Sequence, residues 1–136
     1  MATQHVFSCK QCQGEAGRVT LYAPGEAIPG VPGDELRSLT ADSGNTSAGV
    51  ARLVVTSGWL EETFNRIDAW PVLTAIAAGD ERTLYRIDDE MVPFWCPTCT
   101  ASYCAKHWST WNLFDDGFFD EKRGRCPYGH ERRIVD

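Results

Sequence analysis

The sequence contains 136 residues, the size of one ordinary domain, and its hydrophobic content of 43% excludes a chain that is disordered by composition. The formal net charge is −6 and the pI is about 5.0. Such a chain is a poor candidate for binding nucleic acid, because phosphate backbones require clustered Lys and Arg side chains.

The amino-terminal residues contain no basic stretch followed by an apolar one, so they do not resemble a secretory signal. No run of about 18 apolar residues predicts a membrane span. We therefore expect a cytoplasmic protein with no membrane partner. In a reducing compartment, the six cysteines are better explained as metal ligands than as disulfides.

The first half of the chain predicts strands, a loop and a helix. Residues 18–23 alternate apolar and polar side chains and predict a strand, with which residues 53–55 can pair. The Pro-Gly pairs and small polar residues of 24–49 predict a loop, mobile over residues 41–49. Apolar side chains then recur at steps of one to four residues and predict one face of a helix: Trp59, Leu60, Phe64 and Ile67.

Two further helices are predicted in the middle of the chain. Pro71 suits the first position of a helix that continues through residues 72–78, and Gly79 can end that helix. Asp80 can cap the amino terminus of the next helix, which we expect to continue through Asp89. Strands and helices together predict a small αβ unit, which either supports the rest of the domain or recognises a partner.

Four pairs of closely spaced cysteine and histidine residues dominate the remaining sequence. Two or three residues separate the members of each pair, which lets both side chains face one tetrahedral ion. Pro97, Pro127 and Gly129 lie within or beside these pairs and suit tight turns. The pairs are Cys9 with Cys12, Cys96 with Cys99, Cys104 with His107, and Cys126 with His130.

The eight ligands predict two Zn²⁺ ions, each bound by three cysteines and one histidine. Only four residues separate Cys99 from Cys104, a short interval for neighbouring pairs that wrap one ion, so we favour an interleaved arrangement. A sequential arrangement, with the first two pairs on one ion, is the alternative. In the interleaved arrangement the first site contains Cys9, Cys12, Cys104 and His107, and the second contains Cys96, Cys99, Cys126 and His130.

These expectations define the predicted fold and its organisation. We predict an α+β protein in which residues 1–136 form one zinc-binding domain. Ligand regions at residues 5–14 and 94–133 build an interleaved two-zinc finger, and residues 15–93 form a long αβ insertion that packs on it. Because protein atoms fill all four positions around each ion, the sites are predicted to be structural and not catalytic.

The ligand regions resemble the cross-brace zinc fingers, a group that includes the RING, FYVE and AN1 domains. The spacing of the three cysteines from Cys96 to Cys104 is similar to the middle of a FYVE finger, and the string from Cys104 to His107 is similar to part of an AN1 finger. Trp108 and Trp111, followed by Cys126-Pro127, resemble the second half of a RING domain.

The RING resemblance implies a function in ubiquitin-like transfer. It implies an adaptor that recruits a ubiquitin-type conjugating enzyme without doing chemistry itself, and its docking residues would be Trp108, Trp111, Pro127 and Arg132. One alternative is a zinc-stabilised protein-interaction module that is unrelated to such transfer. A less favoured alternative is a nucleic-acid-binding finger that uses Lys122 to Arg125 and Arg132-Arg133, against which the acidic total argues.

Large apolar residues alternate with acidic residues over residues 108–121, and two interpretations remain open. The aromatic side chains can wedge the zinc sites against the rest of the domain, or some of them can anchor a protein partner. The sequence contains no Gly-rich phosphate loop, His-Glu-x-x-His helix or Gly-x-Ser-x-Gly elbow. We therefore expect no covalent catalytic residue.

Overall fold

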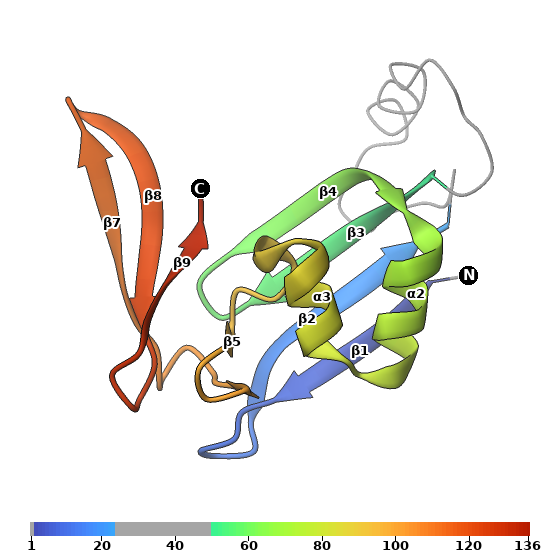
Figure 1. Ribbon diagram of the computed structural model, residues 1–136, viewed down its shortest axis with the longest axis horizontal. Coiled ribbons are helices and arrows are strands. Elements are labelled where there is room, and N and C mark those ends of the chain that lie inside the picture. Colours follow the sequence, from blue (N-terminus) through green and yellow to red (C-terminus); the bar gives the residue numbers. More distant parts are fainter. Residues whose placement is uncertain (1, 24–49) are drawn as a thin grey trace.

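The computed structural model describes residues 2–23 and 50–136, and the predicted loop over residues 24–49 lies outside them. A four-stranded antiparallel sheet, with strand order β1-β2-β3-β4, is the largest element (Figure 1). Its strands are β1 (Thr3–Ser8), β2 (Glu15–Tyr22), β3 (Val50–Ser57) and β4 (Glu61–Asp68). The predicted pairing of residues 53–55 with the first predicted strand is confirmed, because β2 and β3 are neighbours in the sheet.

Alternating apolar side chains of β2 and β3 form the centre of the core. Val19 lies opposite Val55, Leu21 lies opposite Leu53, and all four are buried. Helices α2 (Ala69–Ala78) and α3 (Glu81–Ile87) cover one face of this sheet (Figure 1). Burial of these apolar side chains is the main favourable contribution to the fold.

The helix boundaries follow the local chemistry that the sequence predicts. Gly79 ends α2 with a φ of 64°, a left-handed conformation that glycine adopts readily. Asp80 caps α3, since its carboxylate accepts a hydrogen bond from the backbone N–H of Thr83 at 3.1 Å. Helix α3 ends at Ile87, two residues before the predicted boundary. No helix among the described residues has the length and hydrophobicity that crossing a bilayer requires.

The helix predicted over residues 59–67 is wrong, because residues Glu61–Asp68 form strand β4. Phe64 and Ile67 are three residues apart, as on a helix face, yet they pair with Leu53 and Ala51 of β3. A register shift between Ala51 and Leu53 places an extra residue in β4. This β-bulge brings both side chains to the same face of the sheet, where they pack against the core.

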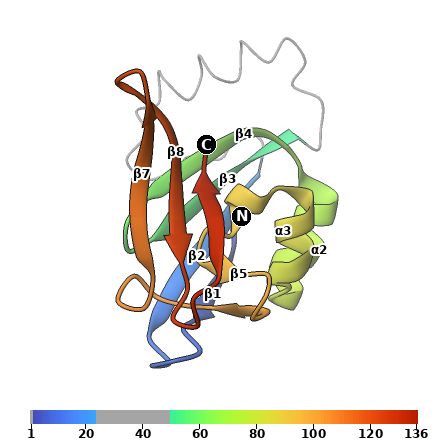
Figure 2. The same ribbon diagram turned by 60° about the vertical axis from the view of Figure 1, so that its left-hand side comes forward.

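The carboxyl-terminal part of the chain adds a two-stranded sheet and a larger three-stranded sheet. A 3-10 turn, η1 (Asp89–Met91), leads into β5 (Trp95–Cys96) and β6 (Ala101–Ser102), which pair with each other. Strands β7 (Ser109–Asp115), β8 (Phe118–Arg125) and β9 (Glu131–Val135) form a three-stranded antiparallel sheet. This second large sheet stands beside the first, with β7 at its outer side (Figure 2).

Residues 94–108 join the two large sheets. Gly17 of β2 lies against the Phe94 ring so closely that a Cβ there would approach the ring to 2.4 Å. The indole N–H of Trp108 donates to the Phe94 carbonyl at 3.0 Å. Trp108 and Ile134 in turn lie against Gly124 of β8.

The described residues form a structure of mixed α and β type, as predicted. Residues 15–22, assigned to the insertion, pair with β1 of the first ligand region.

Candidate metal centres

The first ligand pair lies at the tip of the β1–β2 hairpin. The backbone N–H of Cys9 donates to the Gly14 carbonyl at 2.7 Å, and the N–H of Gln13 donates to the Cys9 carbonyl at 2.8 Å. Gln13 has a φ of 62°, which tightens the turn. The N–H of Lys10 donates to the Ser102 carbonyl at 2.9 Å, so this hairpin tip is attached to β6.

The other three pairs also lie at turns. Cys96 ends β5, and Cys99 lies within the β5–β6 turn. The N–H of His107 donates to the Cys104 carbonyl at 2.9 Å and closes another turn. Cys126 and His130 flank the β8–β9 turn, where Gly129 has a φ of 89°. Tight turns at all four pairs explain why two or three residues separate the members of each pair.

The structure brings the eight predicted ligands together in two groups. In each group, the ligand atoms all lie within 4.8 Å of one another. Their membership is that of the interleaved arrangement and not of the sequential one: Cys9, Cys12, Cys104 and His107 in the first group, and Cys96, Cys99, Cys126 and His130 in the second.

In the first group, the Sγ atoms of Cys12 and Cys104 are 3.7 Å apart. The Nδ1 atom of His107 lies 3.5 Å from the Sγ of Cys9 and 3.2 Å from that of Cys104. Cys9 and Cys104 are buried, whereas Cys12 is exposed. This group joins the β1–β2 hairpin to residues almost a hundred positions later in the chain.

The second group has similar dimensions. The Sγ atoms of Cys99 and Cys126 are 3.7 Å apart. The Nδ1 atom of His130 lies 3.8 Å from the Sγ of Cys96, 3.2 Å from that of Cys99 and 3.4 Å from that of Cys126. This group joins the β5–β6 turn to the β8–β9 turn.

Both groups fit a tetrahedral Zn²⁺ ion. Zn–S bonds of about 2.3 Å and Zn–N bonds of about 2.0 Å, at tetrahedral angles, place two sulfurs about 3.8 Å apart and a sulfur and a nitrogen about 3.5 Å apart. The measured separations of 3.7 Å and 3.2–3.8 Å agree with these values. The same sulfur separations are far longer than the roughly 2.05 Å of a disulfide bond.

Backbone N–H groups point toward several of the sulfurs. Cys99 N–H donates to the Sγ of Cys96, and Tyr128 N–H donates to the Sγ of Cys126, both at 3.4 Å. Burial raises the pKa of the Cys9 thiol, but the backbone N–H groups of Cys104, Cys12 and Gln11 outweigh it and lower the pKa to about 6. Donors of this kind stabilise the thiolate form that binds a metal.

Burial has the opposite net effect at Cys96, where it raises the pKa of the thiol to about 11. Hydrogen bonds from the backbone of Cys99 and Thr98 lower it only in part, and the nearby Cys126 raises it further. Thiolates crowded together in a buried site repel one another, and a divalent cation offsets that repulsion. The donor set therefore suits a bound cation better than an empty cluster.

The four predicted docking residues do not share one surface. Trp108 is buried with 6% of its surface exposed, and its indole N–H is bonded to the Phe94 carbonyl. Arg132 is also 6% exposed. The prediction that these two side chains dock a partner is corrected, because both are committed to the interior. Trp111 is half-buried beneath the Arg125 guanidinium, and Pro127 is exposed.

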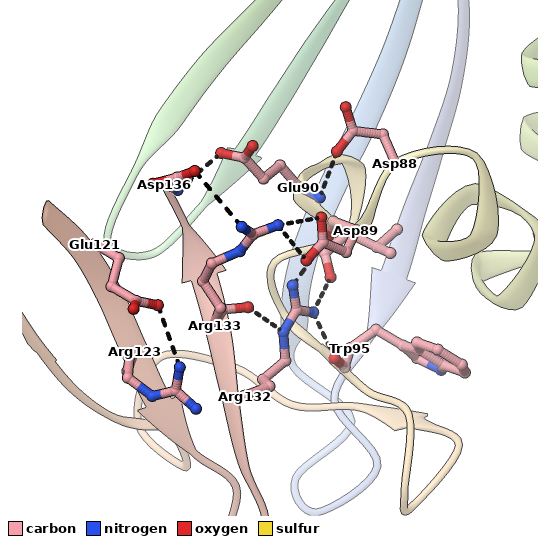
Figure 3. A network of polar contacts seen from close by, with 10 residues as sticks. Asp88, Asp89, Glu90, Trp95, Glu121, Arg123, Arg132, Arg133 and Asp136 are labelled. Atoms are coloured by element: carbon pink, nitrogen blue, oxygen red, sulfur yellow. Dashed lines mark hydrogen bonds and ion pairs between the residues drawn. The ribbon is translucent and has the colours of Figure 1, made fainter.

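The structural role of Arg132 was missed from the sequence. Its guanidinium donates to the carbonyls of Val92 and Trp95 at 2.8 Å and to that of Asp89 at 3.0 Å (Figure 3). It also lies 5.2 Å from the Tyr85 ring centre. The neighbouring Arg133 instead pairs with the Asp89 carboxylate at 3.1 Å. The period-two pattern of β9, in which Arg132 and Ile134 share the buried face, is the signal that could have revealed this role.

Comparison with known proteins adds a family but no named relative. Searches of curated proteins and of solved structures found no match. The family described as "Domain of unknown function (DUF8328)" matches residues 1–136, and the chain therefore belongs to that family.

Proposed function

We propose that the chain binds two Zn²⁺ ions as structural ions and that the resulting framework serves protein–protein interaction without catalysis. The observation that supports this proposal most strongly is the pair of closed Cys3His groups. In each group four protein atoms occupy the tetrahedral positions, so no position is left for a reacting water. Three thiolates and one Zn²⁺ ion would leave each site with a net charge near −1.

A structural role also follows from what the groups connect. The first group links the edge of the large sheet to residues 104–107, and the second links the β5–β6 turn to the β8–β9 turn. Ions at these places would reinforce connections that few hydrogen bonds make, such as the one from the Lys10 N–H to the Ser102 carbonyl and the one from the Arg132 guanidinium to the Trp95 carbonyl. Structural Zn²⁺ sites contribute on the order of 10 kcal/mol in small metal-binding domains.

A nucleic-acid-binding function has little support from the charged residues. Arg123 pairs with Glu121 at 3.2 Å, Arg125 pairs with Glu131, and Arg133 pairs with Asp89. The basic side chains on which such a function would depend are therefore largely neutralised. An acidic chain with neutralised arginines favours protein partners over phosphate backbones.

The narrower proposal is an adaptor for a ubiquitin-type conjugating enzyme, in which Trp111 and Pro127 are the accessible docking residues. The adaptor would bind the charged carrier enzyme and restrain its thioester, so it would supply geometry and no covalent step. Burial of Trp108 and Arg132 leaves only two of the four docking residues that the RING resemblance implies.

A discharge assay tests the adaptor proposal. A panel of carrier enzymes charged with ubiquitin-type proteins is incubated with the full chain, and thioester loss is followed over time. We expect faster discharge from at least one carrier, and we expect Trp111→Ala to reduce that acceleration. If no carrier discharges faster than it does alone, the adaptor proposal fails, whereas the structural zinc proposal does not depend on this result.

A further inference from the structure

The tip of the β7–β8 hairpin carries an unusual concentration of exposed apolar side chains. The exposed fractions are 65% for Phe114, 78% for Phe118, 51% for Phe119 and 37% for Leu113. We refer to residues 113–121 as the hairpin tip. Scattered exposed apolar residues are normal, but a contiguous group of this kind marks an interaction surface.

The turn holds these side chains in place. Asp116 and Gly117 have φ values of 49° and 83°, which are the conformations of a type I′ hairpin turn. The rings of Phe114 and Phe119 meet edge to face, with centres 6.3 Å apart. Phe118 takes no part in that contact and is the most exposed of the three. The hairpin therefore presents its aromatic side chains in a preorganised arrangement, which lowers the entropy cost of binding.

The hairpin also has an available strand edge. Strand β7 pairs with β8 on one side, and no strand in the described part of the chain pairs with its other side. In both views β7 lies at the outer side of the three-stranded sheet (Figures 1 and 2). Exposed edges are usually protected by Pro, Lys or a bulge. Strand β7 contains neither Pro nor Lys, and the extra residue at the register shift lies in β8, at Asp120.

The charge around the hairpin tip has a single sign. Asp115, Asp116 and Asp120 are exposed, and they form no ion pair within the described residues. Residues 109–121 contain no Lys or Arg. The first basic residues that follow in β8 are already engaged, because Lys122 donates to the Asn112 side chain and Arg123 pairs with Glu121. A partner with basic side chains complements this surface.

We propose that β7 and the hairpin tip bind an extended segment of a partner protein that carries apolar and basic side chains, by adding it as a further strand to the β7 edge. The inference rests on the proposed interaction function and names its surface and the chemistry of its partner. Main-chain hydrogen bonds to β7 would supply the pairing. Phe114 and Leu113 point to opposite faces of the strand, so both faces of the added segment would meet an apolar side chain.

The test uses the zinc-loaded full chain and a phage-displayed library of random eight-residue peptides. Selected peptides should be enriched in Lys, Arg, aromatic and β-branched residues, and depleted of Asp, Glu and Pro. The best peptide is then labelled, and its Kd is measured by fluorescence anisotropy. Phe114→Ser/Phe118→Ser should weaken binding at least tenfold. Trp70→Ser, which removes a 75% exposed aromatic side chain from α2, is the matched control and should leave the Kd unchanged.

Two further measurements separate the contributions of charge and strand pairing. Asp115→Asn/Asp120→Asn should weaken binding several-fold at low salt, and the difference should shrink as salt screens the charges. Proline at the centre of the peptide should abolish binding, because it removes a backbone donor and restricts the strand. Selection of acidic or Pro-rich peptides, or a Kd insensitive to the hairpin variants, would overturn the proposal.

Other occupants of the hairpin tip give distinct results. If Phe114→Ser/Phe118→Ser converts a dimer to a monomer in light scattering, the occupant is a second copy of the chain. If it abolishes binding to phosphatidylcholine vesicles, the occupant is a membrane surface. Either result overturns the peptide proposal. Zinc content, measured on every variant, keeps the two proposals separate: a zinc-free protein contradicts the structural zinc proposal, and a zinc-loaded protein that selects no peptide contradicts only this one.

Discussion

Replacement of Arg132 should destabilise the fold strongly, although arginine side chains are usually exposed. Its guanidinium donates four hydrogen bonds, all to backbone carbonyls: those of Val92, Trp95, Asp89 and Arg133. The side chain therefore attaches β9 to the segment that leads into the second metal group. Burial lowers the pKa of Arg132, but the side chain remains charged at neutral pH.

The expected cost of Arg132→Met follows from these contacts. Hydrogen bonds that involve a charged group contribute about 1.5–3 kcal/mol each, and four are lost. Two effects offset part of this loss. The substitution removes the cost of burying a guanidinium, and the Val92 carbonyl keeps its bond from the Trp95 N–H at 3.1 Å. We expect a net loss of about 3 kcal/mol, or roughly 10 °C in Tm for a domain of this size.

The assay is thermal and urea unfolding at a fixed excess of Zn²⁺, so that metal occupancy does not vary between proteins. Arg133→Met is the matched control. It removes an adjacent arginine of the same strand, whose ion pair with Asp89 is partly exposed, and it should cost less than about 1 kcal/mol. Equal effects of the two substitutions, or a cost below about 1 kcal/mol for Arg132→Met, would refute the assigned role of Arg132.

Three further predictions concern the core, a titrating carboxyl group and the first metal group. Gly17→Ala should cost about 2–3 kcal/mol in urea unfolding, because its Cβ would meet the buried Phe94 ring at 2.4 Å. Burial, followed by repulsion from nearby acidic residues, raises the pKa of Glu62 to about 7. The folded chain then binds more protons than the unfolded chain between about pH 4.3 and 7, so this group's contribution to stability falls as pH rises through that window. The Tm of Glu62→Gln should therefore exceed that of the native chain by more at pH 8 than at pH 6. Finally, Cys9→Ser/Cys12→Ser should lose one ion per chain, which metal analysis by mass spectrometry would detect as a fall from two to one.

The ligand groups were predictable because metal binding imposes spacing on the sequence itself. Each pair must form a turn, and turns require few residues and leave Pro or Gly nearby, as Gly129 shows. The short interval between Cys99 and Cys104 also indicated which pairs share a site. Donors from the backbone, such as the Tyr128 N–H to the Cys126 sulfur, could not be predicted, because every residue has an N–H and only the fold directs it.

Strand β4 was predicted wrongly for a specific physical reason. A β-bulge changes the period of a strand locally from two to three, and the spacing of Phe64 and Ile67 then imitates a helix face. The helix end at Gly79 and the cap at Asp80 were predictable because backbone conformation and capping depend on neighbouring residues alone.

The roles of single side chains in the carboxyl-terminal part of the chain depended on long-range contacts. Arg132 follows Glu131 and precedes Arg133, a run that is typical of a solvated strand, and only contact with residues 89–95 shows that it is buried. Trp108 was expected either to pack or to dock, and its bond to the Phe94 carbonyl shows packing. Phe118 belonged to the same aromatic segment, yet it is 78% exposed.

The central claim is that two closed groups of three thiolates and one imidazole each hold an ion. Metal content of the purified full chain, measured together with titration of free thiols before and after chelation, tests it most directly. The account predicts two Zn²⁺ ions per chain, and all six cysteines should become reactive thiols only once the metal has been removed. A chain without stoichiometric zinc, or one whose cysteines react only after reduction, would contradict it.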